Sequence, residues 1–181
     1  MEQKQYTIAV FTENHIGLLN KITIVFTRRK INIESLTVSE SQIEGIHSFT
    51  IVVNATHEKV QKTVAQINKL VEVIKAFYYE ENQIHAQEIA LYKMPAAAIS
   101  QGIDMGRFIR GNNARILEMT PEYFVIEKTG TNIETQELLE KLKPFGILEF
   151  IRSGRVIVTK PMKPLIQYME EKHEAYDYVR K

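Results

Sequence analysis

Asn14 and Gly17 lie directly before a segment with the apolar spacing of a helix, and their residue types suit the binding of a small anion. The first N–H groups of a helix have no intrahelical partners, and together with the helix dipole they attract negative charge. Gly17 lacks a Cβ, so a ligand can approach its backbone closely. The Asn14 side chain both donates and accepts, which suits a ligand with a carboxylate and an ammonium. The alternative is that Asn14 only caps the helix and Gly17 only turns the chain.

The chain offers this loop no group that would convert a bound ligand. It has no phosphate loop of the form Gly-x-x-x-x-Gly-Lys-Ser/Thr, no Gly-x-Gly-x-x-Gly dinucleotide turn and no Gly-x-Ser-x-Gly elbow. There is no cysteine, and the five histidines lack the spacing of a helical metal pair. We therefore predict no catalytic residue and no metal site, and a loop that holds its ligand without changing it.

The composition excludes several other classes of protein. Of the 181 residues, 44% are hydrophobic and 25% are charged, which is typical of globular proteins. A net charge of +1 gives no electrostatic footprint for nucleic acid. No run approaches the ~18 apolar residues that cross a membrane, and the N-terminal residues do not follow a signal-peptide pattern. We expect a cytoplasmic protein that binds neither nucleic acid nor membrane.

Hydrophobic periodicity predicts a βαββαβ unit in the first half of the chain. Strands are indicated by alternating apolar residues, and helices by apolar residues at intervals of three and four. The expected strands are 6–11, 31–38, 47–53 and 71–79, and the expected helices are 18–26 and 60–70. This order is the ferredoxin-like arrangement, an antiparallel sheet with two helices on one face.

The same order of elements then begins again. A hairpin is expected around Thr120-Pro121, and Thr131 with Glu134 three residues later predicts the capped start of a helix. The first helix of this half, around residues 99–110, contains two glycines, so we expect it to be short or irregular. We predict an α+β protein with two ferredoxin-like domains, residues 1–82 and 83–160, followed by a helical tail over residues 161–181.

Four segments of the chain resemble a known family. FTENHIGLLNKITIVFTRRKINIESLTV, residues 11–38, is similar to the opening of the regulatory small subunits of acetolactate synthase, which are ACT-domain proteins. The resemblance continues in LVEVIKAFYYEE, ARILEMTPEYFVIEKTGT and FIRSGRVIV, and it covers most of residues 5–160. The NIESLTV segment and Arg-Ser-Gly at residues 152–154 are its more specific parts.

This resemblance implies a function that spacing alone does not show. Family members are homodimers that bind a branched-chain amino acid, usually valine, where two ACT domains meet. They associate with a large catalytic subunit holding thiamine diphosphate, Mg²⁺ and FAD, raise its activity and confer feedback inhibition; no cofactor is expected in this chain. Carried over by position, the effector site consists of Asn14, Ile16, Gly17 and Leu18 of one protomer with Asn32 and Ile33 of the other.

Leu18 stands where many family members carry a smaller residue, and a bulkier side chain there is expected to narrow the effector pocket. The sequence leaves open which branched-chain amino acid is sensed, the subunit ratio, the surface that contacts the catalytic subunit and the role of the tail. Two alternatives also remain. One is a free-standing ACT-domain amino-acid sensor or transcriptional regulator. The other is a small enzyme on a ferredoxin-like scaffold, which the missing catalytic constellation disfavours.

Overall fold

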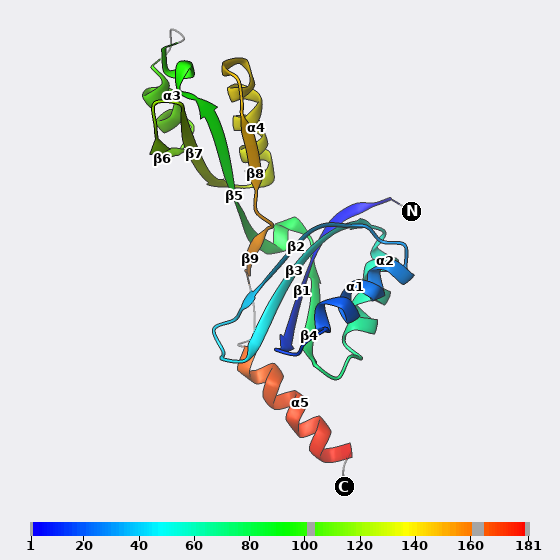
Figure 1. Ribbon diagram of the computed structural model, residues 1–181. Coiled ribbons are helices and arrows are strands. Elements are labelled where there is room, and N and C mark those ends of the chain that lie inside the picture. The colour runs from blue at the N-terminus through cyan, green and yellow to red at the C-terminus, as the bar shows by residue number, and fades with distance from the viewer. Residues whose placement is uncertain (1, 101–103, 161–164, 180–181) are drawn as a thin grey trace. The chain divides into compact units, whose positions relative to one another are not determined.

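The computed structural model describes residues 2–100, 104–160 and 165–179 (Figure 1). The chain divides into two compact units. The first consists of Met1–His85 together with Ile157–Lys181, and the second of Ala86–Val156. The segment from Ile157 onward therefore belongs to the same unit as the N-terminal half, although it follows the second unit in sequence.

The first unit contains a four-stranded antiparallel sheet with the strand order β2-β3-β1-β4. Two helices cover one face of this sheet (Figure 1). In chain order, the elements are β1 (Lys4–Glu13), α1 (Leu18–Arg28), β2 (Ile33–Glu40), β3 (Ile46–Ala55), α2 (His57–Ile67) and β4 (Val73–Tyr79). The predicted βαββαβ order of this half is confirmed, and β2 and β4 are the edge strands.

The core of the first unit lies between this sheet and its helices. Alternate residues of β1, such as Ile8 and Val10, point to the helices and are fully buried. The apolar stripe of α1 meets them, because residues at intervals of three and four share one helix face. That stripe consists of Leu18, Ile22, Val25 and Phe26. Burying a large aliphatic or aromatic side chain contributes roughly 1.5–3 kcal/mol, so this layer supplies most of the unit's stability.

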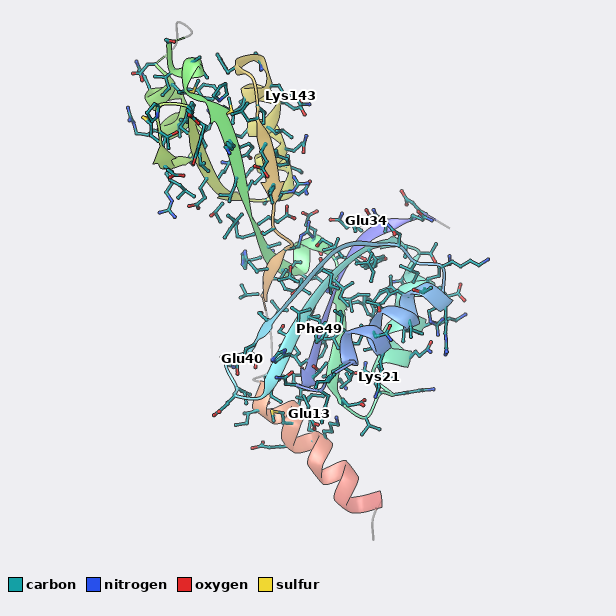
Figure 2. The ribbon with its side chains drawn as sticks, viewed as in Figure 1. Glu13, Lys21, Glu34, Glu40, Phe49 and Lys143 are labelled. Atoms are coloured by element: carbon teal, nitrogen blue, oxygen red, sulfur yellow. The ribbon has the colours of Figure 1, made fainter. Side chains whose placement is uncertain are left out.

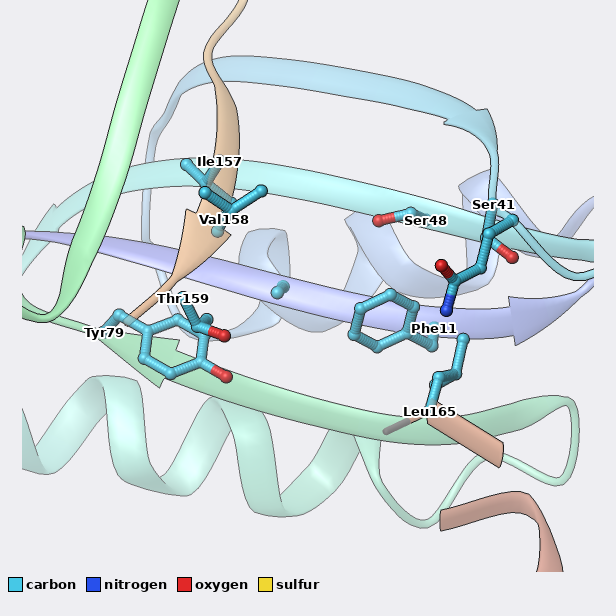
Figure 3. Close-up of a pocket in the computed structure, with 10 residues that line it drawn as sticks. Phe11, Ser41, Ser48, Tyr79, Ile157, Val158, Thr159 and Leu165 are labelled. Atoms are coloured by element: carbon cyan, nitrogen blue, oxygen red, sulfur yellow. The ribbon is translucent and has the colours of Figure 1, made fainter. Parts of the chain in front are cut away.

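The helix-free face of the first sheet is also covered. Thr7 and Ala9 of β1 point away from the helices, yet they are only 2% and 4% exposed. Strand β9 (Val156–Thr159) and the start of helix α5 (Leu165–Val179) lie over this face. Between them remains a cavity of about 400 Å³, lined by Phe11, Tyr79 and Leu165 among others (Figure 3). The C-terminal segment thus shields a face that two layers alone would leave open.

The second unit repeats the topology of the first. Its sheet has the order β6-β7-β5-β8, the same order as in the first unit, and β9 pairs additionally with β5. In chain order, the elements are β5 (Ile84–Pro95), η2 (Ala96–Ser100), α3 (Met105–Gly111), β6 (Arg115–Met119), β7 (Tyr123–Gly130), α4 (Asn132–Leu142), η3 (Lys143–Phe145) and β8 (Glu149–Arg152). A short 3-10 turn, η1 (Glu81–Gln83), precedes β5. The predicted α+β fold with two ferredoxin-like sheets is confirmed.

Several local predictions for the second half are confirmed as well. The hairpin around Thr120 connects β6 and β7, and Thr131 with Glu134 forms the predicted capping box at the start of α4. Hydrogen bonds from Thr131 hold the pKa of Glu134 below its ordinary value. The helix expected around residues 99–110 is short, as predicted: it is the seven-residue α3, after the 3-10 turn η2. Part of the predicted helix, residues 101–103, lies outside the described residues.

Candidate functional site

The loop of residues 14–17, called here the 14–17 loop, connects the end of β1 to the start of α1. Gly17 is the N-cap of α1 and has a left-handed backbone with a φ of 84°. A glycine adopts this conformation without the strain that a Cβ would cause, so Gly17 suits the turn from the loop into α1. A Cβ at Gly17 would meet nothing within 4 Å, so the space above the backbone is open. Ile16 projects fully into solvent.

The N-terminus of α1 carries the features of an anion site. Asn14 is not the capping residue, and no side chain in the described part of the chain accepts a hydrogen bond at this cap. The first turn contains no acidic residue within the described helix. The Leu18 amide donates to the His15 carbonyl at 3.3 Å, and the Lys21 amide to the Gly17 carbonyl at 3.2 Å. The helix dipole therefore points at open solvent, and no carboxylate stands in the described first turn to neutralise it.

Backbone hydrogen bonds fix where the 14–17 loop begins. The Glu13 amide donates to the Glu72 carbonyl at 3.0 Å, and the Asn14 amide donates to the Gly45 carbonyl at 3.0 Å. Two pairs of side chains lie at the loop and beside it. His15 Nε2 lies 3.0 Å from Glu13 Oε2, and Lys21 pairs with Glu72, whose pKa it lowers from the ordinary value. These pairs keep the nearby carboxylates engaged and away from the helix N-terminus.

The Leu18 side chain lies in the core and not on the loop surface. It is 3% exposed and packs with the other apolar residues of α1. It therefore helps to fix the first turn of α1 to the sheet. The expectation that a bulky Leu18 narrows the effector pocket remains a prediction about a site formed with a second chain.

Asn32 and Ile33, the other predicted site residues, lie at the far end of the same sheet. Ile33 is opposite Val53 on β3, whereas Glu13, beside the 14–17 loop, is opposite Ile46. Ile46 and Val53 are seven residues apart on β3, which corresponds to roughly 24 Å at ~3.4 Å per residue. Figure 2 shows the labelled Glu34 and Glu13 toward opposite ends of this sheet. One chain does not bring the two halves of the predicted site together.

The start of β2 is nevertheless available to a partner. β2 is an edge strand, so one side of its backbone has no neighbour among the described strands of this sheet. Asn32 is exposed, and its Nδ2 donates to Glu34 Oε1 at 3.2 Å, while Ile33 is partly buried. The two halves of the predicted site therefore lie on surfaces that face solvent in the single chain.

Sequence reasoning missed a buried charge cluster in the second unit. Glu88 is 6% exposed, and its carboxylate forms ion pairs with Arg152 Nε at 3.2 Å and with Arg155 Nε at 3.6 Å. The Ser153 amide donates to the Ile89 carbonyl at 2.8 Å beside it. The Arg-Ser-Gly-Arg run was the available signal, because two arginines flanking a strand end suit a buried carboxylate. No group of three potential metal ligands occurs among the described residues, and no described helix is long and apolar enough to span a membrane.

Comparison with known proteins assigns both units to one family. Residues 8–75 match the family described as the AHAS small subunit-like ACT domain. The fold of the first unit is thus that of an ACT domain. Residues 87–161 match the family described as the small subunit of acetolactate synthase.

Individual relatives agree with this assignment. The chain is 34% identical to the acetolactate synthase small subunit of Mycobacterium bovis, over 88% of this chain and 95% of that protein. It is 33% identical to the acetolactate synthase small subunit of Bacillus subtilis, over 81% and 86% of the two chains. The crystal structure of the acetolactate synthase small subunit from Thermotoga maritima has the same fold, with a TM-score of 0.79 and 23% identity over 88% of this chain and 99% of that one. This chain belongs to the family of acetolactate synthase small subunits.

Proposed function

We propose that this chain is a regulatory subunit, without catalytic activity of its own, which associates with the large catalytic subunit of acetolactate synthase. In the complex it raises the activity of that subunit and makes it sensitive to inhibition by valine. Membership of the small-subunit family, supported by matches in both units, is the observation that carries the proposal. Thiamine diphosphate, Mg²⁺ and FAD would be held by the catalytic partner, in the cytoplasm, and this chain would contribute allosteric control.

The 14–17 loop is the proposed binding site of the effector. The carboxylate of valine would accept hydrogen bonds from the free N–H groups at the start of α1, where the helix dipole favours negative charge. The side-chain oxygen of Asn14 would accept from the ammonium group, and the partly buried Ile33 of a second copy would contact the branched side chain. Micromolar to millimolar binding corresponds to about 4–8 kcal/mol, which a few charge-assisted hydrogen bonds and one apolar contact can supply.

Pairing of two β2 edges would complete this site. β2 runs from the end of the sheet at Val53 to the end at His47, which is the end that carries the 14–17 loop. In a two-fold symmetric dimer, antiparallel β2 strands place the start of one strand beside the finish of the other. The Asn32 and Ile33 of each protomer would then approach the 14–17 loop of its partner. The separation of the two half-sites within one chain supports this homodimeric arrangement.

A site between two chains also provides a mechanism for regulation. A ligand that touches both protomers binds best to one relative arrangement of the two ACT domains, and it shifts the population toward that arrangement. By linkage, the effector can change the activity of the catalytic subunit only if that subunit distinguishes the same two arrangements.

Association with the cognate catalytic subunit tests the first half of the proposal. Purified chain and catalytic subunit are mixed, separated by size-exclusion chromatography and assayed for acetolactate formation from pyruvate without valine. We expect co-elution and a higher rate than that of the catalytic subunit alone. Separate elution with an unchanged rate would contradict the proposal and favour a free-standing amino-acid sensor. Acetolactate formation by the isolated chain would contradict the assignment of a non-catalytic role.

A further inference from the structure

The first half of α5 packs against the end of the first sheet that carries the 14–17 loop (Figure 1). Leu165 is 2% exposed and forms a buried cluster with Ile46 of β3 and Ile74 of β4. Tyr168 lies edge-on against Phe77 of β4, with ring centroids 5.1 Å apart. The two family matches end at residues 75 and 161. Helix α5 therefore lies beyond the residues that define the family, yet it is docked on the ACT domain.

Lys172 of α5 makes a specific attachment to the segment before β4. Its Nζ donates to the Val71 carbonyl at 2.6 Å and to the Val73 carbonyl at 2.8 Å. Burial lowers the pKa of the Lys172 ammonium from its ordinary value, while the nearby Glu13 and Glu72 carboxylates oppose this shift. A charged donor makes a stronger hydrogen bond to a carbonyl than a neutral donor does. Residues 71–73 are thus held to α5 on both sides of Glu72.

The residues held by α5 are the neighbours of those that hold the 14–17 loop. The carbonyl of Glu72, between the two carbonyls bound by Lys172, accepts from the Glu13 amide. The carbonyl of Gly45, directly before Ile46, accepts from the Asn14 amide. Figure 2 shows the labelled Glu13 at the end of the sheet from which α5 departs. Both backbone hydrogen bonds that set the start of the loop are therefore one residue away from a contact with α5.

We infer that α5 positions the 14–17 loop, with Lys172 fixing residues 71–73 and Leu165 fixing Ile46. Lys172 is thus a positioning residue for the effector site, acting through the Glu72 carbonyl between its two acceptors, while Leu165 acts through Ile46 next to Gly45. The consequence for regulation rests on the proposed function: a docked α5 keeps the loop in the conformation that binds the effector, and its release lowers effector affinity. The tail then modulates the sensitivity of the sensor without touching the ligand.

The first test measures how readily the start of the 14–17 loop opens when no ligand is present. Amide hydrogen exchange is compared between the wild-type chain and Lys172→Met, which keeps the aliphatic stem and removes the donors. We expect exchange at Glu13 and Asn14 to become faster by on the order of tenfold, because local opening needs only these flanking contacts to release. Lys160→Met is the matched control: Lys160 Nζ donates at 2.7 Å to the Asn82 carbonyl, beyond the other end of β4. Unchanged exchange at Glu13 and Asn14 in Lys172→Met would overturn the inference.

The second test measures valine binding to the same three proteins by calorimetry, beside their thermal unfolding. We expect about fivefold weaker binding for Lys172→Met, at the low end of ordinary coupling between sites, and no change for Lys160→Met. A merely structural role for Lys172 would lower the unfolding temperature and leave the affinity at 25 °C unchanged, which would contradict positioning. If the wild-type chain binds no valine, the proposed effector fails while hydrogen exchange still decides the role of α5.

Discussion

The two halves of this protein share one topology but differ at the N-termini of their helices. In the second domain, the Asp104 side chain accepts from the Arg107 amide at 2.9 Å to cap α3, and the Thr131–Glu134 box closes α4. In the ACT domain, α1 begins at a left-handed Gly17 without a side-chain cap in the described structure. The second domain therefore caps α3 and α4 with side chains, whereas α1 and α2 of the ACT domain have no side-chain cap in the described structure.

This contrast lies in a few residues and not in the fold. A ferredoxin-like sheet hosts many activities, so its presence in both halves predicts no ligand. What sets α1 apart is the left-handed Gly17 at its N-cap and a first turn without an acidic residue, whereas α2 carries Glu58 in its first turn.

The two domains also differ in how they are held together. The core of the ACT domain is apolar, whereas the second domain buries Glu88 between Arg152 and Arg155. Removing one member of a buried ion pair leaves an uncompensated charge and costs about 3–5 kcal/mol. Glu88→Ala should therefore destabilise the second domain by that amount and leave valine binding to the ACT domain unchanged.

Urea denaturation followed by circular dichroism checks this prediction, with the exposed Glu149→Ala in the same domain as control. If the urea midpoint of Glu88→Ala equals that of the control, the cluster of Glu88 with the two arginines does not stabilise the domain.

The next largest effect is expected at the open helix N-terminus. Gly17→Asp adds a Cβ at a φ of 84° and a negative charge where the effector carboxylate would lie. Repulsion between like charges in such a site should weaken valine binding by roughly 100-fold while the dimer persists. Gly146→Asp, at a φ of 81° in the second domain, adds a Cβ at a positive φ and a negative charge away from the site. Equal valine affinities for the two variants, measured by calorimetry, would place the effector elsewhere.

Asn14→Ala should have a smaller effect on the same site. Loss of one side-chain acceptor for the ammonium group removes one charge-assisted hydrogen bond, which corresponds to roughly tenfold weaker binding. The backbone bond from Asn14 to Gly45 does not need the side chain, so the loop should keep its conformation. The concentration of valine that gives half-maximal inhibition measures the change. A normal response to valine would mean that the asparagine side chain does not contact the effector.

The smallest predicted effect is the loss of stability when a helix N-cap is removed. Thr131→Ala removes the hydroxyl that caps α4 and should cost about 1 kcal/mol of stability. Thr56→Ala is the matched control in the ACT domain, because Thr56 stands at the N-cap of α2 but makes no side-chain cap hydrogen bond in the described structure. Thermal unfolding of both variants measures the difference. Equal losses of stability in the two variants would indicate that the cap hydrogen bond of the Thr131 hydroxyl does not stabilise α4.

Much of the fold could be predicted from the sequence because its elements are strongly periodic. The apolar stripe of α1 and the alternation in β1 follow directly from local residue spacing, and the Thr131–Glu134 box follows from a four-residue pattern. The sequence could not predict that the segment from Ile157 onward belongs to the first unit. Its position depends on packing against residues that are distant in the sequence. The contacts of Lys172 with backbone carbonyls were invisible for the same reason.

The candidate site was predictable in part. Asn14 and Gly17 carry a recognisable pattern, and the structure places them in an exposed loop at a helix start. The burial of Leu18 was implied by its place in the apolar stripe, which outweighs its place in the loop motif. That Asn32 and Ile33 lie at the opposite end of the sheet required the strand register. That Asn32 and Ile33 of one protomer approach the 14–17 loop of its partner remains a prediction.

The most direct test of regulation is acetolactate formation by the cognate catalytic subunit, saturated with this chain, across a titration of valine. The account predicts that the chain raises the rate and that valine then lowers it, with a midpoint in the micromolar to millimolar range. A stimulated rate that valine leaves unchanged, at concentrations up to tens of millimolar, would contradict the proposed role of the 14–17 loop as a valine sensor.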